Sequence, residues 1–483
     1  MEADLPHRSD AADVFNDELF RVAILLAAFF VLLVELGLGD DVVDRLERAA
    51  LLVDRAAGLI QAEDPVLRVR VVFAPTTEND LEVAAVEPRG AGLRVGVLEI
   101  DVDVEVLLPL RLEEFADRLV GGGVDLEDGE LREAGAVIFS KTTMPDYGML
   151  SSGLSSFHPL TRNPWDLGKN PGGSSSGAGA AAAAGYGPLH LGTDIGGSVR
   201  LPGCWCGLVA LKPSLGRIPV DPPYVGRVAG PMTRTVDDAA LMMSVLSKPD
   251  RRDGMSLPAH DINWKALDKS PRKLRFGLML DAGTGQALEK PVREVAVKAA
   301  KAFEAAGAVV TEVAGILTRE MLDGIDDFFR VRLWGDLAKL STQERSKMLP
   351  YILQWAERGA KLTGVEALDG FNQTIAIRAA AAKLFCELDY VISPVAPVVN
   401  YPAEFAAPLN DPAKPFEHIG YTLPWNMSEN PAISVNGGYD PHGFPIGVQI
   451  VGRRFDDIGV LAMAKAFEGL RGPQKPWPSP PSE

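Results

Sequence analysis

A glycine- and serine-rich centre constrains this chain more than any other stretch of its 483 residues. It begins as Pro171-Gly-Gly-Ser-Ser-Ser-Gly177 and ends as Leu191-Gly-Thr-Asp-Ile-Gly-Gly-Ser-Val-Arg200, with an alanine-rich segment between. A flexible linker is the plainest interpretation of the first part. Against it, the alanines form a helix, so the serines lie at a helix N-terminus where hydroxyls cap free N–H groups. The second glycine-serine turn is also joined to apolar and charged residues that a linker does not need.

Glycines that flank a serine allow the backbone to approach a ligand closely and to aim several N–H groups at one point. That arrangement suits an oxyanion hole for acyl transfer. From the residues alone two interpretations stay open. The centre is either a catalytic or anion-binding site, or a structural turn.

The two parts of this centre, residues 172–177 and 192–202, resemble the signature of the amidase-signature family. Ser174 and Ser198 stand 24 residues apart in it. The similarity extends over residues 131–467 and includes four further segments, at 132–148, 206–219, 230–240 and 443–454. The resemblance implies an α/β fold with a large mixed, twisted β-sheet core covered by helices on both faces.

The resemblance also implies a Ser–cis-Ser–Lys catalytic unit. Ser198 is then the nucleophile, and Ser174 is the bridging serine after a cis peptide bond from Gly173. Further roles follow for residues of the same two loops. The backbone N–H groups of Ile195, Gly196, Gly197 and Ser198 would form the oxyanion hole, and the loops would be braced by Gly173, Ser175, Asp194 and Arg200.

The catalytic lysine of the family falls on Leu98, within the apolar segment 92–100. Leucine cannot accept a proton, and three explanations stay open. The residue is misassigned, another base such as Lys141 replaces it, or the protein binds without turnover. Residues 1–140 contain 12 Arg and no Lys against 30 acidic residues, with no Tyr, Trp or Cys. One hypothesis is therefore that part of this stretch is assigned imperfectly.

The charge balance and the cysteine content restrict partners and compartment. With a net charge of −17, the chain lacks the excess of basic residues that is typical of a nucleic-acid binder. Three cysteines make no disulfide framework, so a cytoplasmic location is expected, and Cys204 and Cys206 are interpreted as core residues. Neither a metal nor a cofactor is predicted. The apolar run 22–34 is too short to cross a bilayer and predicts a buried or partner-facing helix, with a membrane-associated helix as the alternative.

Three regions are expected along the chain. Residues 1–60 form an N-terminal helical segment packed on the core, residues 61–471 the amidase-signature domain, and residues 472–483 a disordered proline-rich tail. Hydrophobic periodicity and the residues that start and end helices and strands predict a helix over 291–306. They also predict strands at 136–140, 274–280, 308–313, 389–394, 432–435 and 446–451.

The function expected is hydrolysis of an amide-type C–N bond in a small carboxamide, anilide or carbamate, through an acyl-enzyme on Ser198. Two alternatives are kept: the amidase subunit of a tRNA-dependent amidotransferase, and an inactive binding or scaffold member of the family. The partner is then a small amide rather than nucleic acid or membrane, and a homodimer is one assembly left open. An apolar acyl pocket, with core packing as its alternative, is predicted from Met144, Tyr147, Phe157 and Trp165.

Overall fold

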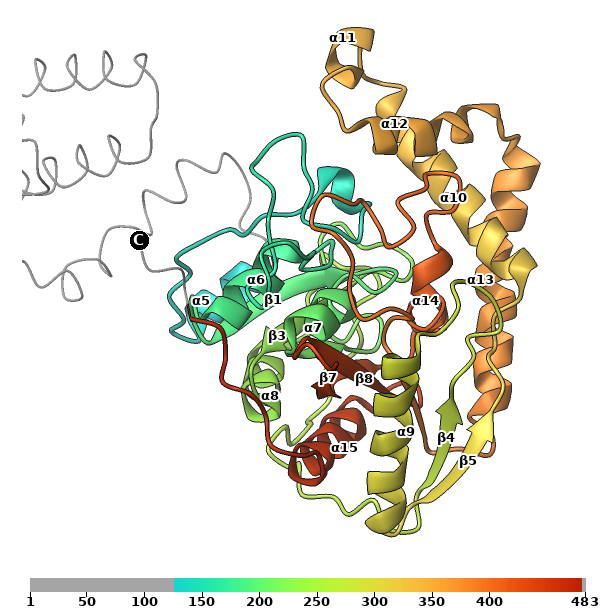
Figure 1. Cartoon of the computed structure of the whole chain (residues 1–483). Coiled ribbons are helices and arrows are strands. Elements are labelled where there is room, and N and C mark those ends of the chain that lie inside the picture. Colours follow the sequence, from blue (N-terminus) through green and yellow to red (C-terminus); the bar gives the residue numbers. More distant parts are fainter. Residues whose placement is uncertain (1–125, 480–483) are drawn as a thin grey trace, which may run out of the picture. The chain divides into compact units, whose positions relative to one another are not determined.

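The computed structural model describes residues 126–479, which lie within one compact unit, Leu108–Glu483. Its centre, in the described part, is an eight-stranded sheet in the order β1-β3-β2-β7-β8-β6-β4-β5 (Figure 1). The strands are β1 (Leu189–Asp194), β2 (Val209–Lys212), β3 (Val228–Thr233), β4 (Arg275–Met279), β5 (Val309–Val313), β6 (Tyr390–Pro394), β7 (Ala432–Tyr439) and β8 (Pro445–Gly452). β4 pairs in parallel with β5 and β6, and the other neighbours are antiparallel. The predicted mixed α/β sheet is confirmed.

Helices surround this sheet, and α10 packs along α13 beside it (Figure 1). The described α-helices are α5 (Leu126–Glu133), α6 (Ser176–Ala184), α7 (Arg200–Cys206), α8 (Val236–Leu246), α9 (Lys290–Ala305), α10 (Arg319–Leu337), α11 (Thr342–Arg345), α12 (Pro350–Glu357), α13 (Gly364–Leu384), α14 (Leu423–Met427) and α15 (Asp457–Leu470). Three short 3₁₀ helices complete the set: η1 (Asp146–Gly148), η2 (Gly359–Lys361) and η3 (Glu417–Ile419).

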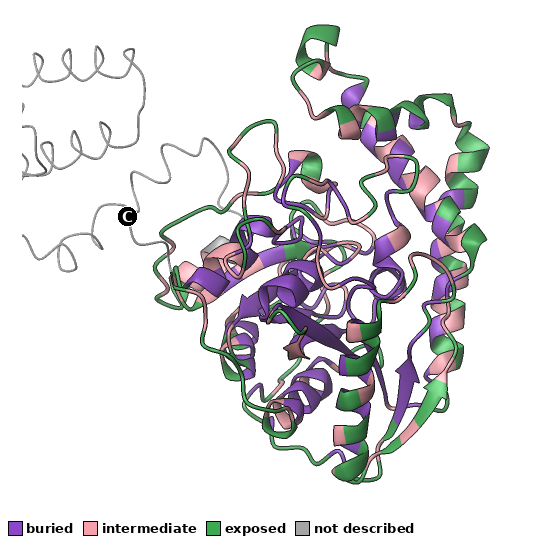
Figure 2. Cartoon of the chain, viewed as in Figure 1, coloured by how far each residue is buried: buried purple, intermediate pink, exposed green. Residues whose placement is uncertain are grey.

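The alternation of side chains along β8 separates the core from the polar face of the sheet. Ile446, Val448 and Ile450 are buried in the main apolar cluster, which also contains residues of α8, α9 and α15 (Figure 2). Gly447 and Gln449 point to the opposite face, because successive residues of a strand alternate sides. There Gly447 lies against α7 and Gln449 bonds to Arg200 of α7. One strand thus serves the core and the predicted site together.

The strand–helix–strand unit predicted at residues 274–313 is confirmed as β4, α9 and β5. Pro291 lies in the first turn of α9, where its missing N–H costs nothing, and Gly307 follows the helix at φ +93°. The buried face of the helix has helical spacing and consists of Val292, Val295, Ala296, Ala299, Ala300 and Phe303. The strands predicted at 389–394, 432–435 and 446–451 are also present as β6, β7 and β8.

The strand predicted at 136–140 is wrong. These residues have no regular structure, and Val137 and Phe139 expose 65% and 69% of their surface. A strand requires a hydrogen-bonded neighbour, and no strand of the described chain pairs with this segment. Its apolar character therefore did not indicate a place in the sheet.

The proline-rich tail differs from the expectation of disorder as far as residue 479. Residues 472–479 form no helix or strand, yet Trp477 packs against Trp165 and lies under the Arg234 guanidinium. The Gln474 side chain also accepts a hydrogen bond from Asn436 at 2.9 Å. Composition indicated the lack of regular structure but not these contacts.

The predictions for residues 1–60, for the apolar run 22–34 and for Leu98 lie outside the described residues. So does the start of the domain expected at residue 61. Within residues 126–479, no helix has the length and apolar character needed to cross a bilayer.

Close packing of α7 on the sheet yields a first prediction. A Cβ added to Gly203 would lie 2.3 Å from the Ala210 Cβ of β2. Gly203→Ala should therefore push α7 from the sheet and lower the free energy of unfolding by about 1–3 kcal/mol. The matched control is Gly335→Ala in an exposed turn of α10, where nothing lies within 4 Å of the added methyl. It should stabilise the protein by about 1 kcal/mol. Thermal unfolding that is unchanged in Gly203→Ala would contradict the close approach.

Candidate active site

The two loops of the glycine- and serine-rich centre are hydrogen-bonded to each other. The Gly173–Ser174 peptide bond is cis, as the resemblance predicted. The next residue, Ser175, donates its backbone N–H to the Ser198 carbonyl at 3.2 Å. A Cβ on Gly173 would lie 2.4 Å from the Ser152 backbone nitrogen, so this position admits only glycine. The chain therefore holds Ser174 and Ser198 on neighbouring loops, although they are 24 residues apart.

Ser175 acts differently from the helix cap that the sequence predicted. It precedes the first residue of α6, but its hydroxyl caps no N–H of that helix. Its Oγ instead accepts the Thr193 N–H at 3.1 Å and donates to the Thr193 carbonyl at 3.2 Å. The Ser175 hydroxyl thus holds the serine loop against the end of β1, which leads directly into the loop of Ser198.

Ser174 and Ser198 line one cavity of about 1130 Å³ together with Ile195. Ser174 is buried, whereas Ser198 is half-buried. Among residues 126–479, no hydrogen bond joins the two hydroxyls. The Ser174 hydroxyl lies toward Gly148 instead, 3.6 Å from where a Cβ of that glycine would stand.

The loop before Ser198 borders the cavity through Ile195 and Ser198. The N–H groups of Ile195, Gly196 and Ser198 have no acceptor within residues 126–479. The Gly197 N–H is different, because it donates to the Asp194 carboxylate at 2.8 Å. Of the predicted oxyanion donors, Gly197 is therefore already engaged, and the other positions are available to a ligand.

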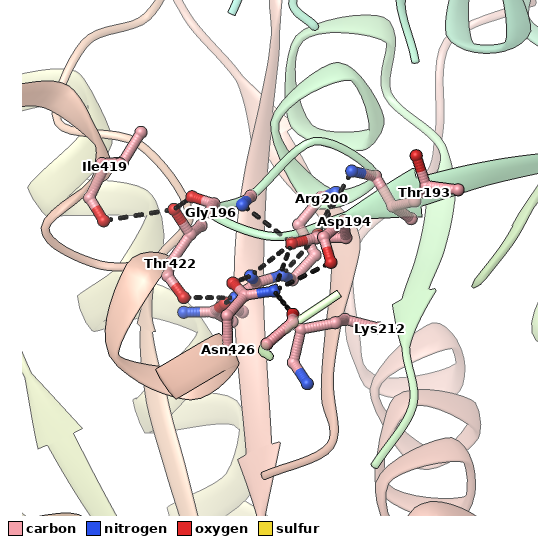
Figure 3. A network of polar contacts seen from close by, with 12 residues as sticks. Thr193, Asp194, Gly196, Arg200, Lys212, Ile419, Thr422 and Asn426 are labelled. Carbon is pink, nitrogen blue, oxygen red and sulfur yellow. Dashed lines mark hydrogen bonds and ion pairs between the residues drawn. The ribbon is translucent and has the colours of Figure 1, made fainter. Parts of the chain in front are cut away.

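Asp194 and Arg200 form a fully buried ion pair, with side chains 3.0 Å apart and no exposed surface (Figure 3). Both oxygens of the carboxylate accept from the guanidinium, and they also accept the Gly197 and Val199 N–H groups. Burial alone would raise the pKa of Asp194, but the nearby Arg200 charge and its hydrogen bonds lower that pKa to about 2. The ion pair and its hydrogen bonds to the Gly197 and Val199 N–H groups hold the Ser198 loop in place.

Every N–H of Arg200 is used. Besides Asp194, the guanidinium donates to the Thr422 carbonyl, to Gln449 Oε1 and to Asn426 Oδ1. Thr422 also donates its hydroxyl to the Gly196 carbonyl at 2.7 Å, which fixes the loop from the other side. Two side chains predicted as braces therefore connect β1, α7, β8 and the segment around α14.

Sequence reasoning missed the buried lysine of this network. Lys212 ends β2, is fully buried, and donates to the Pro213 carbonyl at 2.9 Å. Burial and the neighbouring Arg200 charge lower the pKa of Lys212 to about 7, although Asp194 opposes this. A signal was present, because Lys212 directly follows the apolar run 208–211, where a charged residue is exceptional.

The predicted acyl-pocket residues divide into two groups. Met144 and Tyr147 line the cavity of Ser198. Phe157, with 94% of its surface exposed, does not, and Trp165 packs against Tyr439 and Trp477.

A second hollow of about 30 Å³ borders Ser198 on its apolar side. Its walls include Phe329, Trp355, Phe416, Ile419 and Leu423.

The remaining candidates are placed as follows. Lys141 lines the larger cavity, whereas Leu98 lies outside the described residues. Cys204 and Cys206 are buried in α7, and burial raises the pKa of both thiols, that of Cys204 to about 12. This confirms them as core residues. Residues 126–479 contain no group of three His, Cys, Asp or Glu side chains arranged to hold a metal ion.

The fold and the site together define a class of α/β protein. Its mixed sheet carries a serine loop with a cis peptide bond, and this loop packs against a glycine–serine turn at a cavity. The family model described as Amidase matches residues 129–461. This chain belongs to the amidase family, and it carries the amidase signature.

Individual relatives agree with this assignment. The chain is 33% identical over 387 residues to an acylamidase of Rhodococcus erythropolis, covering 76% of this chain and 78% of that protein. It is 34% identical to the glutamyl-tRNA(Gln) amidotransferase A subunit of Desulforapulum autotrophicum, covering 70% and 75%. Among solved structures, a bacterial aryl acylamidase of the amidase-signature family superposes with a TM-score of 0.66 at 28% identity, covering 72% and 76%. The family assignment makes this chain an amidase-family hydrolase.

The buried ion pair yields a second prediction. Asp194→Asn should lower the free energy of unfolding by about 3–5 kcal/mol, because it leaves the Arg200 charge buried without its counterion. The folded pKa of Asp194 is about 2, below its ordinary 3.8. Its stabilisation is thus complete above pH 3.8 and is lost as the pH falls toward 2.

Urea unfolding of wild type and Asp194→Asn across this range measures the difference. The difference in the free energy of unfolding between the two proteins should stay constant near neutral pH and decrease only in acid. Asp261→Asn is the control, because Asp261 is exposed. A gap that widens in acid, or an equal loss in the control, would contradict the assigned pKa.

Proposed function

We propose that this protein hydrolyses an amide-type C–N bond of a small molecule through an acyl-enzyme on Ser198. The observation that carries the proposal is the position of Ser198. It borders a large cavity, and unengaged backbone N–H groups precede it on a loop that a buried ion pair holds in place. Preorganised donors of this kind stabilise the charge that develops on a carbonyl oxygen during acyl transfer.

The reaction would proceed in two halves. The Ser198 Oγ attacks the substrate carbonyl carbon, and the resulting oxyanion accepts the N–H groups of Ile195 and Gly196. The bond to nitrogen then breaks, the amine leaves with the proton that Ser198 gave up, and water later releases the acid. Ser174 would pass that proton between the nucleophile and the leaving nitrogen. Its hydroxyl must then approach Ser198 when substrate is bound, as catalytic hydrogen bonds of unliganded enzymes often do.

The shape of the site favours a small substituent beside the reacting carbonyl. The apolar hollow next to Ser198 measures about 30 Å³, which is room for a small group only. Its walls are aromatic and aliphatic, so they would exclude a charged group. Simple carboxamides and anilides meet this requirement, which agrees with the names of the acylamidase relatives.

A second candidate rests on the relatives named as the A subunit of glutamyl-tRNA(Gln) amidotransferase, which reach 34% identity. In that case the chain would act as the amidase subunit of a larger enzyme. Purification of the native protein with a stoichiometric partner, together with hydrolysis that depends on that partner, would favour it. Turnover of a simple anilide by the isolated chain would favour the first candidate.

Labelling of Ser198 is the direct test. A fluorophosphonate probe should react with the wild-type protein, because an activated serine attacks its phosphorus, displaces fluoride and becomes phosphonylated. Ser198→Ala should not be labelled, whereas Ser244→Ala, which removes an exposed hydroxyl on α8, should be labelled like wild type. Labelling that persists in Ser198→Ala would reject the nucleophile.

The general base requires its own test, since Leu98 occupies the position where the resemblance places a lysine. Peptide mapping of residues 1–140 by mass spectrometry determines which residue is present. If leucine is confirmed, anilide turnover should be feeble, and Leu98→Lys should raise it by about 10²–10⁴, the usual contribution of a general base. If lysine is found, the protein should be a competent amidase as isolated.

Full turnover by a protein with a confirmed leucine at position 98 would contradict both of these expected outcomes. Lys141, which lines the cavity, would then be the first alternative base to replace by methionine. An inactive binding protein, the remaining alternative, would bind amides but show neither turnover nor labelling, even with lysine at position 98.

A further inference from the structure

Two arginines border the cavity of Ser198 without belonging to the amidase signature. Arg332 lies on α10, and Arg227 directly precedes β3, so segments more than 100 residues apart bring them to one cavity. Both side chains are half-buried. Both contact Tyr224, with the Arg332 guanidinium carbon 4.6 Å and that of Arg227 5.5 Å from the centre of its ring.

The positive charge of this pair is not neutralised by the described chain. Within residues 126–479, the Arg332 side chain forms neither a hydrogen bond nor an ion pair, and the Arg227 side chain donates only to the Pro222 carbonyl, at 3.4 Å. Two acids also line the cavity. Asp194 is occupied by Arg200, and the exposed Asp221 makes no ion pair with either arginine in this part of the structure.

The buried arginines of the described fold differ in this respect. Arg200, Arg217 and Arg330 each form an ion pair with an aspartate at 2.8–3.0 Å. Burial and the neighbouring Arg332 charge lower the pKa of Arg227, which indicates that the two guanidiniums repel each other. An anion between them would relieve this repulsion and supply the missing acceptors.

We propose that Arg227 and Arg332 bind a carboxylate of the substrate, so that the protein selects amides bearing an acid group away from the scissile bond. This rests on the proposed function, because it assigns the substrate class of the same cavity. The planar guanidinium matches a carboxylate with two parallel hydrogen bonds, and stacking on Tyr224 restricts its orientation. The arginine pair holds the charged end of the substrate, while the reacting carbonyl lies at Ser198.

Matched substrates separate this role from a structural one. The first pair is glutaric acid mono-4-nitroanilide and its methyl ester, and the second is 4-acetamidobenzoate and its methyl ester. These pairs place the carboxylate on the acyl side or on the amine side. Arg332→Gln and Arg227→Gln should each raise KM for the preferred acid by about tenfold to a hundredfold, the usual effect of losing a charge-assisted hydrogen bond. They should leave kcat and the KM of the ester within about twofold.

Two further variants complete the kinetic test. Arg332→Lys should restore part of the affinity, because it keeps the charge but loses the fork geometry. Arg358→Gln is the control for net charge, since Arg358 is exposed and pairs with Asp327 away from the cavity. Its KM values should equal those of wild type for both the acid and the ester.

Binding to the full-length Ser198→Ala protein tests the inference without turnover. Calorimetry should show tighter binding of the preferred acid than of its ester, and the difference should shrink at high salt and disappear when Arg332→Gln is added. If wild type hydrolyses no anilide yet this preference is present, the proposed function fails while the carboxylate site stands. Equal affinity for acid and ester, or equal losses for both in the arginine variants, would overturn the site.

Discussion

The buried ion pair between Asp194 and Arg200 is the interaction on which the site depends. Its two members are six residues apart, at the end of β1 and the start of α7, and the turn that contains Ser198 lies between them. The carboxylate orients the Gly197 and Val199 N–H groups, and the guanidinium reaches Gln449 of β8. A buried pair of this kind contributes little net stability compared with apolar packing, but it strongly penalises any arrangement that separates the two charges. The pair therefore favours the observed conformation of the turn.

Charge is balanced over the whole buried cluster rather than pair by pair. Lys212 lies close enough to lower the pKa of Asp194, while the Arg200 charge lowers the pKa of Lys212 to about 7. Near neutral pH the lysine can therefore lose its proton, which removes its repulsion with the Arg200 guanidinium. By contrast, Arg227 and Arg332 lie against the Tyr224 ring at the cavity rim and form no ion pair with an acid in the described residues. The buried charges of Asp194 and Arg200 are paired within the protein, whereas the two arginines at the cavity rim are available to a ligand.

Sequence patterns predicted those parts of the fold that local chemistry determines. The β4–α9–β5 unit followed from helical spacing, an early Pro291 and the terminating Gly307. Local sequence patterns gave wrong predictions where the structure of a segment depends on a partner far away in the sequence. The run 136–140 is apolar but has no ladder partner in the described chain, and the Ser175 hydroxyl bonds to Thr193 rather than to its own helix. Motif position predicted Ser174 and Ser198, which line one cavity, and predicted Asp194 and Arg200 as braces of the loops. No motif indicated Lys212, Asn426 or the cavity arginines, because their meeting depends on packing between segments far apart in the sequence.

The two-sided character of β8 couples the formation of the core to the formation of the site. Sliding this strand by one residue against its neighbours would turn Gln449 toward the apolar cluster and bring Ile450 against the Arg200 guanidinium. Both errors would be costly, since one buries an amide among aliphatic side chains and the other removes an acceptor from a buried charge. A compact state with a complete core but a misassembled site is therefore disfavoured during folding. Random substitutions on the polar side of β8 should accordingly reduce the yield of folded protein as often as they reduce its catalytic rate.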